Sequence, residues 1–186
     1  SLVSDLLEIH GCKIIDLDLI SREVVMPGTE GLQELVDTFS KSILLSDGSL
    51  DRKNLRDVLY KKGRNRALIE QILHPKILHK MKAMMDDYHE GVMIVVIPLL
   101  VEKELWGPFD RAVLVDCETE TQIKRLMERE NIDSEKAKTM MMAQASREQR
   151  LKLDEHLPTD VIENNARLSD LKDKVHLLNQ KLFSLI

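Results

Sequence analysis

The chain has 186 residues, of which 43% are apolar and 32% charged, and its formal net charge is −5. This length predicts one domain, and this composition supports a packed core and excludes a disordered chain. The negative balance argues against a nucleic-acid partner. Cys12 and Cys117 form no CxxC motif, which favours a reducing, cytoplasmic setting over a disulfide-bonded one.

No membrane-spanning segment is expected. The longest apolar run, residues 92–101, has ten residues and is interrupted by Pro98. A membrane helix needs about 20 such residues.

The first elements alternate between helix and strand. Leu2, Val3, Leu6 and Leu7 are spaced as in a helix that ends at Gly11. Residues 12–18 are short, apolar and β-branched, which predicts a buried strand with an acidic carboxyl end. We expect helices to follow at residues 19–25, 29–39, 51–61, 64–73 and 75–88.

The second half continues the alternation. The predicted strands are residues 92–97, 111–116 and 160–164, and the predicted helices are residues 119–130, 134–149 and 169–185. Strands that alternate with helices indicate an α/β fold with a parallel sheet. The long helical block between the first two strands predicts an inserted subdomain at the ligand end of that sheet.

Two carboxylates are the first candidates for chemistry. Asp16 and Asp18 flank Leu17, and in a continuing strand they would lie on one face at its carboxyl end, where α/β sheets bind ligands. There they could bind a metal or accept a proton from a substrate hydroxyl, although one or both could instead cap the next helix. Arg22 could contact an anion, but an ion pair at helical spacing is the favoured interpretation.

Arginines gather in the second half. Arg125 and Arg129 are four residues apart, and Arg147 follows on the next predicted helix. A guanidinium group matches phosphate oxygens, but without further context a solvated face shared with neighbouring glutamates is favoured. His74, before Pro75, is either a substrate contact or a turn residue.

Seven segments of the chain together form a family pattern, and they are HGCKIIDLDLISREVVMPG, DGSLDRKNLRDVLY, LHPKI, VVIPLLVE, RAVLVDCETETQIKRLMERE, QASREQRL and DVIENN. In these segments, and in their order, the chain resembles the dephospho-coenzyme A kinase family. The resemblance implies a three-layer α/β/α P-loop kinase fold with a parallel sheet. Residues 1–186 would form one kinase domain, with a helical substrate-binding insert at 26–90 and a helical lid at 119–150.

The family transfers the γ-phosphate of ATP to the ribose 3′-hydroxyl of dephospho-coenzyme A, which gives coenzyme A and ADP. The resemblance implies ATP as the co-substrate and Mg²⁺ as the metal ion. It implies that the protein is a monomer or a small homo-oligomer. It implies that Asp18 and Arg125 are catalytic and that the substrate is bound by Asp16, Arg22 and His74. The residues implied on the ATP and lid side are Arg129, Arg147 and Asn164, and Ser1 is implied as the metal ligand. The alternatives are another P-loop kinase acting on a nucleotide or small molecule, and a non-catalytic protein without the P-loop.

The sequence departs from the family in two places. The phosphate-binding loop GxxxxGK(S/T) is absent, and Ser1 aligns with its last residue. We therefore expect about 15 further residues, carrying a strand, the glycine-rich turn and the lysine, to precede Ser1. The connection between Arg150 and Asp160 is a few residues longer than the family pattern and carries Glu155-His156-Leu157-Pro158.

Overall fold

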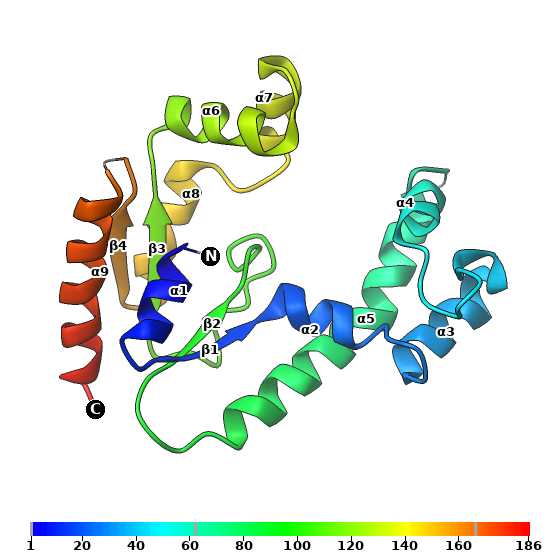
Figure 1. The fold of residues 1–186 in the computed structure, drawn as a ribbon, viewed down its shortest axis with the longest axis horizontal. Coiled ribbons are helices and arrows are strands. Elements are labelled where there is room, and N and C mark those ends of the chain that lie inside the picture. The colour runs from blue at the N-terminus through cyan, green and yellow to red at the C-terminus, as the bar shows by residue number, and fades with distance from the viewer. Residues whose placement is uncertain (1, 62, 166) are drawn as a thin grey trace. The chain divides into compact units, whose positions relative to one another are not determined.

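The computed structural model describes residues 2–61, 63–165 and 167–186 (Figure 1). The chain divides into two compact units, one of residues 13–97 and one of residues 1–12 together with 98–186. Each unit contains its own two-stranded parallel sheet, β1-β2 in the first and β3-β4 in the second. The predicted parallel α/β organisation is therefore confirmed within each unit.

The sheet of the 13–97 unit joins the two ends of the helical insert. Strand β1 (Lys13–Asp16) pairs in parallel with β2 (Met93–Val96), so that Asp16 lies opposite Val96 at the carboxyl edge. The core of this unit includes Ile15 of β1, which is 1% exposed. A parallel pair needs a long crossover between its strands, and the helices of the insert provide it.

The helices of the insert begin where the sequence places a cap. Helix α2 (Leu17–Glu23) is capped by Asp16, and α3 (Glu30–Phe39) is capped by Thr29. A short 3₁₀ helix η1 (Lys41–Ile43) leads to α4 (Arg52–Lys61), and Asp51, just before α4, accepts a hydrogen bond from the Asn54 N–H at 2.9 Å. Polar caps satisfy amide groups that a helix leaves open.

Two predictions in this unit are wrong. Residues 17 and 18 belong to α2 and not to the strand, because the Asp16 cap starts the helix there; Asp16 and Asp18 therefore do not share a strand face. The two helices predicted on either side of Pro75 are one helix, α5 (Gly63–Asp86). An internal proline costs a helix about 3 kcal/mol, and the packing of α5 against α2, α3 and α4 offsets this cost.

The second unit contains both ends of the described chain. Strand β3 (Ala112–Asp116) pairs in parallel with β4 (Thr159–Glu163), and α9 (Leu168–Phe183) packs against β4 and against α1 (Leu2–Ile9). The buried residues of α9 are Leu171, Val175, Leu178 and Leu182. These four residues form the buried apolar face of α9.

The end of α1 requires a glycine. Gly11 has φ +97°, a conformation that glycine adopts without strain, and a Cβ there would lie 3.8 Å from the Phe183 ring. The following Cys12 is buried, and its Sγ donates to Asn179 Oδ1 at 3.2 Å. Burial raises the pKa of the Cys12 thiol, which therefore stays protonated and keeps this link between α1 and α9.

Helices α6 (Thr119–Glu130) and α7 (Ser134–Met142) follow β3 as a helical hairpin (Figure 1). The helix predicted over residues 134–149 is in fact two, since α7 ends at Met142 and α8 (Arg147–Leu151) begins with a capping box on Ser146. Reciprocal bonds of Ser146 and Gln149 favour a new start over a continued helix. A 3₁₀ helix η2 (Lys152–Glu155) then leads to β4.

Among the described residues, no helix is both long and apolar enough to cross a bilayer.

Candidate active site

Asp16 and Asp18 have different tasks at the carboxyl end of β1. Asp16 Oδ1 accepts a hydrogen bond from the Asp18 N–H at 2.8 Å, which confirms the capping alternative for Asp16. Asp18 lies in the first turn of α2 and is exposed. Within the described part of the chain, its carboxylate has no hydrogen bond and no ion pair. Both of its oxygens are therefore available to a ligand.

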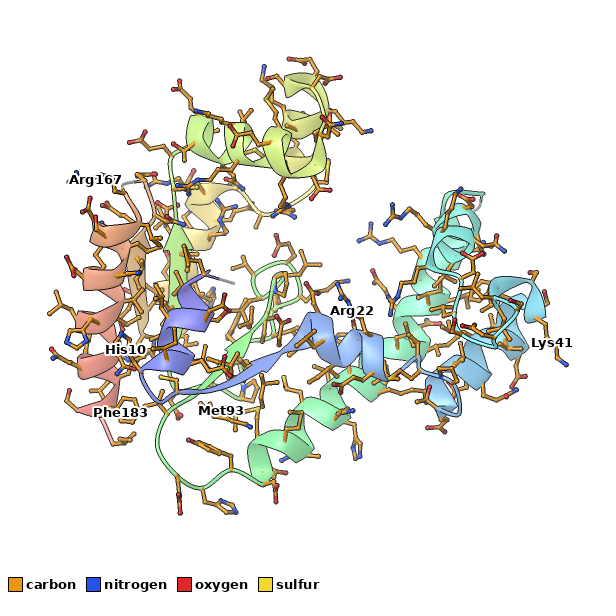
Figure 2. The ribbon with its side chains drawn as sticks, in the orientation of Figure 1. His10, Arg22, Lys41, Met93, Arg167 and Phe183 are labelled. Carbon is orange, nitrogen blue, oxygen red and sulfur yellow. The ribbon has the colours of Figure 1, made fainter. Side chains whose placement is uncertain are left out.

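Arg22 and His74 are the other candidates of this unit. Arg22, one turn after Asp18 on α2, is exposed (Figure 2), and the structure describes no ion pair between the two residues. The favoured ion-pair interpretation for Arg22 is thus wrong. His74 lies half-buried in the middle of α5 and not in a turn.

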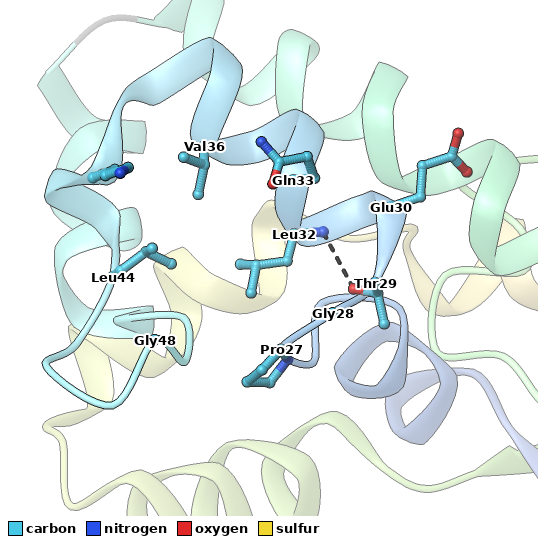
Figure 3. Close-up of a pocket in the computed structure, with 10 residues that line it drawn as sticks. Pro27, Gly28, Thr29, Glu30, Leu32, Gln33, Val36, Leu44 and Gly48 are labelled. Carbon is cyan, nitrogen blue, oxygen red and sulfur yellow. Dashed lines mark hydrogen bonds between the residues drawn. The ribbon is translucent and has the colours of Figure 1, made fainter.

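Among the described residues, two pockets are lined mainly by the helical insert. The first, of about 440 Å³, contains the apolar side chains of Leu32, Val36 and Leu44 and the polar side chains of Gln33 and Lys41 (Figure 3). Its remaining lining residues are Pro27, Gly28, Thr29, Glu30 and Gly48. Small-molecule sites commonly have such a volume and such a mixture of apolar walls and few polar groups.

The second pocket is also about 440 Å³ and is lined by Lys76 and Lys80 of α5, but their charges are already paired. Lys76 Nζ lies 2.9 Å from Glu34 Oε1 and 3.1 Å from Glu30 Oε2, and these hydrogen bonds raise the pKa of Lys76. Lys80 Nζ lies 2.6 Å from Glu23 Oε2. Lys41 of the first pocket, by contrast, has no such partner among the residues that the structure describes.

In the other unit, an ion pair between a buried carboxylate and a half-exposed arginine marks the carboxyl end of β3. Asp116 is 2% exposed, and Arg147 of α8 binds its carboxylate through Nε at 2.8 Å and Nη2 at 2.6 Å. The hydrogen bonds and the negative charge of Asp116 raise the pKa of Arg147, so this guanidinium stays charged at every physiological pH. A bidentate pair of this kind fixes geometry as well as charge.

Arg125 and Asn164 also meet at this end of the sheet. Arg125 Nη1 of α6 donates to the Asn164 carbonyl at 2.7 Å, and the Asn164 N–H donates to the Asp116 carbonyl at 2.7 Å. The neighbouring Asn165 Oδ1 accepts from the Glu118 N–H at 2.7 Å. Arg125, Arg147 and the loop after β4 thus form one cluster at the carboxyl ends of β3 and β4, the position at which α/β sheets bind ligands.

One described candidate of this unit, Arg129, is not part of this cluster. Arg129 lies at the end of α6, is exposed, and pairs with its neighbour Glu130 at 2.8 Å. Ser1 lies outside the described residues. Over residues 2–61, 63–165 and 167–186, no group of three histidine, cysteine, aspartate or glutamate side chains is placed to hold a metal ion.

Asp116 is the site residue that the sequence prediction missed. It ends an apolar strand with a carboxylate, as Asp16 does, and this pattern is the signal that could have found it. The sequence does not reveal its partner, because Arg147 lies 31 positions further along the chain.

We expect Arg147→Ala to lower the thermal unfolding midpoint more than Asp116→Asn does. The first variant leaves a buried carboxylate without its partner, whereas the second leaves a half-exposed guanidinium that water can solvate. Circular dichroism melting curves measure the difference, and Arg129→Ala serves as a control for loss of an exposed arginine. Equal losses for the two variants would show that the burial of Asp116 does not matter.

The residues predicted to act together are divided between the two units. Asp16, Asp18, Arg22 and His74 belong to the unit of residues 13–97, while Arg125, Arg129, Arg147 and Asn164 belong to the other. In each unit, these residues are nevertheless found where the parallel sheet presents its carboxyl edge. The exceptions are Arg129 and His74, each of which lies on a helix of its own unit.

Comparison with known proteins identifies the family. The family model described as dephospho-CoA kinase matches residues 1–170. The dephospho-CoA kinase of Photobacterium profundum is 38% identical over 179 residues, which cover 96% of this chain and 88% of that protein. That of Thiobacillus denitrificans is 36% identical over 176 residues, which cover 94% of this chain and 85% of that protein.

Solved structures agree in fold. A crystal structure of a Thermus thermophilus protein superposes with a TM-score of 0.76 at 23% identity and covers 97% of this chain and 90% of its own. Dephospho-CoA kinase from Campylobacter jejuni superposes with a TM-score of 0.70 at 21% identity, covering 98% and 90%. The chain therefore has the P-loop kinase fold and belongs to the dephospho-CoA kinase family.

Proposed function

We propose that this protein phosphorylates the ribose 3′-hydroxyl of dephospho-coenzyme A with ATP, giving coenzyme A and ADP. The observation that carries the proposal is the family match over residues 1–170. The test is ADP formation with dephospho-coenzyme A compared with nucleoside monophosphates, and mass spectrometry of the product. Faster turnover of a nucleoside monophosphate would instead favour the alternative of another P-loop kinase.

Asp18 is the proposed proton acceptor. The 3′-hydroxyl oxygen attacks the γ-phosphorus of ATP, the bond to the β-phosphate oxygen breaks, and ADP leaves. The hydroxyl proton passes to the Asp18 carboxylate, which is exposed and has both oxygens available. Asp16 acts on this step through its hydrogen bond to the Asp18 backbone, which sets the start of α2.

Arginines of the proposed lid, residues 119–150, stabilise charge on the transferring group. Arg125 uses one Nη for the Asn164 carbonyl, and its other donors can reach a phosphate. Arg147 uses Nε and Nη2 for Asp116, which leaves Nη1 for the nucleotide. Arg129, in the exposed last turn of α6, is a secondary candidate for this role. Closure of such a lid excludes water, which would otherwise compete with the acceptor hydroxyl.

The helical insert, residues 26–90, is the proposed acceptor-binding region, with Arg22 and His74 as contacts. Within it, we assign the pocket of Leu32, Val36, Leu44 and Lys41 to the pantetheine arm. The apolar walls suit the dimethyl group of that arm. Lys41, which has no ion-pair partner among the described residues, suits the diphosphate from which the arm extends. The second pocket is a poorer candidate because its lysines are neutralised.

We expect Val36→Trp, which fills this pocket, to raise KM for dephospho-coenzyme A by about tenfold or more and to leave KM for ATP unchanged. Turnover of adenosine monophosphate, which lacks the arm, should stay unchanged as well. Thr38→Trp on the same helix does not line the pocket and is the control. An unchanged KM in Val36→Trp would refute the assignment of the arm to this pocket.

Mg²⁺ would enter with ATP, whose β- and γ-phosphates it neutralises, since magnesium is usually held by substrate phosphates and few protein groups. The proposed protein ligand, Ser1, lies outside the described residues.

The free cysteines Cys12 and Cys117 fit a reducing compartment, and we place the reaction in the cytoplasm.

A further inference from the structure

The connection from α7 to α8 contains a buried residue whose backbone is bound by side chains. Ala145 is 9% exposed. Its N–H donates to Glu102 Oε1 at 2.7 Å, and its carbonyl accepts from Arg150 Nη1 at 2.7 Å. A buried peptide group without partners is costly, so these two side chains stabilise this one position of the connection.

Glu102 is held by a segment that is itself packed on the core. Four neighbours of Glu102 pack against Ala112, Leu153 and Leu157, and these neighbours are Leu100, Val101, Trp106 and Phe109. The Trp106 ring also stacks on His156, with 4.7 Å between the ring centroids. The Glu102 side chain remains exposed, so its carboxylate keeps its hydration while it accepts the hydrogen bond.

The start of α8 is fixed separately. Arg147 binds the buried Asp116, and Ser146 and Gln149 form the capping box of the helix. Glu102 therefore fixes Ala145, the residue before the Ser146 cap of α8, at the point where the α6–α7 hairpin rejoins the body of its unit. The hairpin, whose helix α6 carries Arg125, is attached at β3 and at Ala145, so the attachment at Ala145 contributes to the position of that arginine.

We propose that Glu102 is a positioning residue for the lid: through the Ala145 N–H it fixes the hinge about which the α6–α7 hairpin closes. This inference rests on the proposed function, since it assumes that the hairpin closes over ATP. Glu102 makes no contact with the reacting atoms in this scheme. It acts on the reaction by placing Arg125, and misplacement of a catalytic group by about 1 Å can cost up to about 100-fold in rate.

Hydrogen exchange in the free protein tests the hinge without any need for catalysis. In Glu102→Ala, the amide of Ala145 should exchange about tenfold faster than in the unchanged protein, because a charge-assisted hydrogen bond is lost. Glu102→Gln should retain protection, since its amide oxygen accepts the same bond. Glu102→Asp keeps the charge but is too short, and it should behave like Glu102→Ala. Asp110→Ala removes an exposed charge from the same loop and is the control.

Kinetics and nucleotide binding then test positioning. In Glu102→Ala, kcat should fall by about 10- to 100-fold with KM for dephospho-coenzyme A unchanged, and Glu102→Gln should restore it. Protection of α6 and α7 on addition of MgATP should be weaker in Glu102→Ala. If the Ala145 amide of Glu102→Ala exchanges at the same rate as in the unsubstituted protein, the hinge is refuted. If that amide exchanges faster but kcat and the protection by MgATP do not change, the positioning role is refuted. If the unchanged protein fails to phosphorylate dephospho-coenzyme A, the proposed function falls, while the exchange experiments still decide on the hinge.

Discussion

Asp18→Asn should lower kcat for dephospho-coenzyme A by about 10²- to 10⁴-fold, the usual contribution of a general base. An amide cannot accept the hydroxyl proton, yet it has nearly the same shape as the carboxylate. The side chain is exposed and has no hydrogen bond or ion pair within the described residues, so folding should not change. Steady-state kinetics measure the effect, and the thermal midpoint and the Kd for ATP should match those of the unchanged protein.

The matched control for Asp18 is Asp87→Asn. Asp87 is also an exposed aspartate of the 13–97 unit, and it lies just after α5 and lines neither of the two pockets described above. Its amide variant should keep full activity. If Asp18→Asn turns over normally and folds normally, another group must accept the proton and the proposed mechanism is wrong.

Arg125→Ala should have the largest effect of all, a loss of about 10³- to 10⁵-fold in kcat, as expected for an arginine that stabilises a transferring phosphoryl group. The variant also loses the hydrogen bond to the Asn164 carbonyl, but that bond is exposed and contributes little to folding. Arg125→Lys should recover only part of the rate, because an ammonium group keeps the charge without the planar fork. Single-turnover measurements separate this loss from weaker ATP binding.

Lys124→Ala is the control for Arg125. Lys124 is the preceding residue on α6, is exposed, and carries the same charge. Its removal changes the net charge of the lid equally but should leave kcat unchanged. A loss of less than about tenfold in Arg125→Ala would show that this arginine does not stabilise the transferring phosphoryl group.

Much of the fold could be predicted because local patterns determine it. The strands at residues 92–97 and 111–116 were recognisable from their runs of apolar residues, and the structure places β2 and β3 there. The caps Thr29 and Asp51 and the glycine at residue 11 mark the ends of helices by chemistry that acts over a few residues.

The errors lie where tertiary packing competes with local preference. Proline favours a break, yet α5 continues through Pro75 because its packing against three other helices outweighs the cost. Residues 134–149 have helical periodicity throughout, but the capping box at Ser146 and the hydrogen bonds at Ala145 start a new helix instead. The first strand ends at Asp16, two residues before its predicted end, because Asp16 caps α2.

The site divides in the same manner. From residue types and strand ends alone, the sequence placed Asp16 and Asp18 at a carboxyl edge and marked Arg125 and Arg147 as side chains that match phosphate, since these depend on local position and side-chain chemistry. It left a capping role open for the two aspartates and favoured a solvated face for the arginines, and only the family resemblance implied their roles in the reaction. Only the tertiary structure joined Arg147 to Asp116, Arg125 to the loop after β4, and Glu102 to Ala145. Each of these contacts links residues more than 30 positions apart, and such partners are selected by how strands and helices pack rather than by any pattern along the chain.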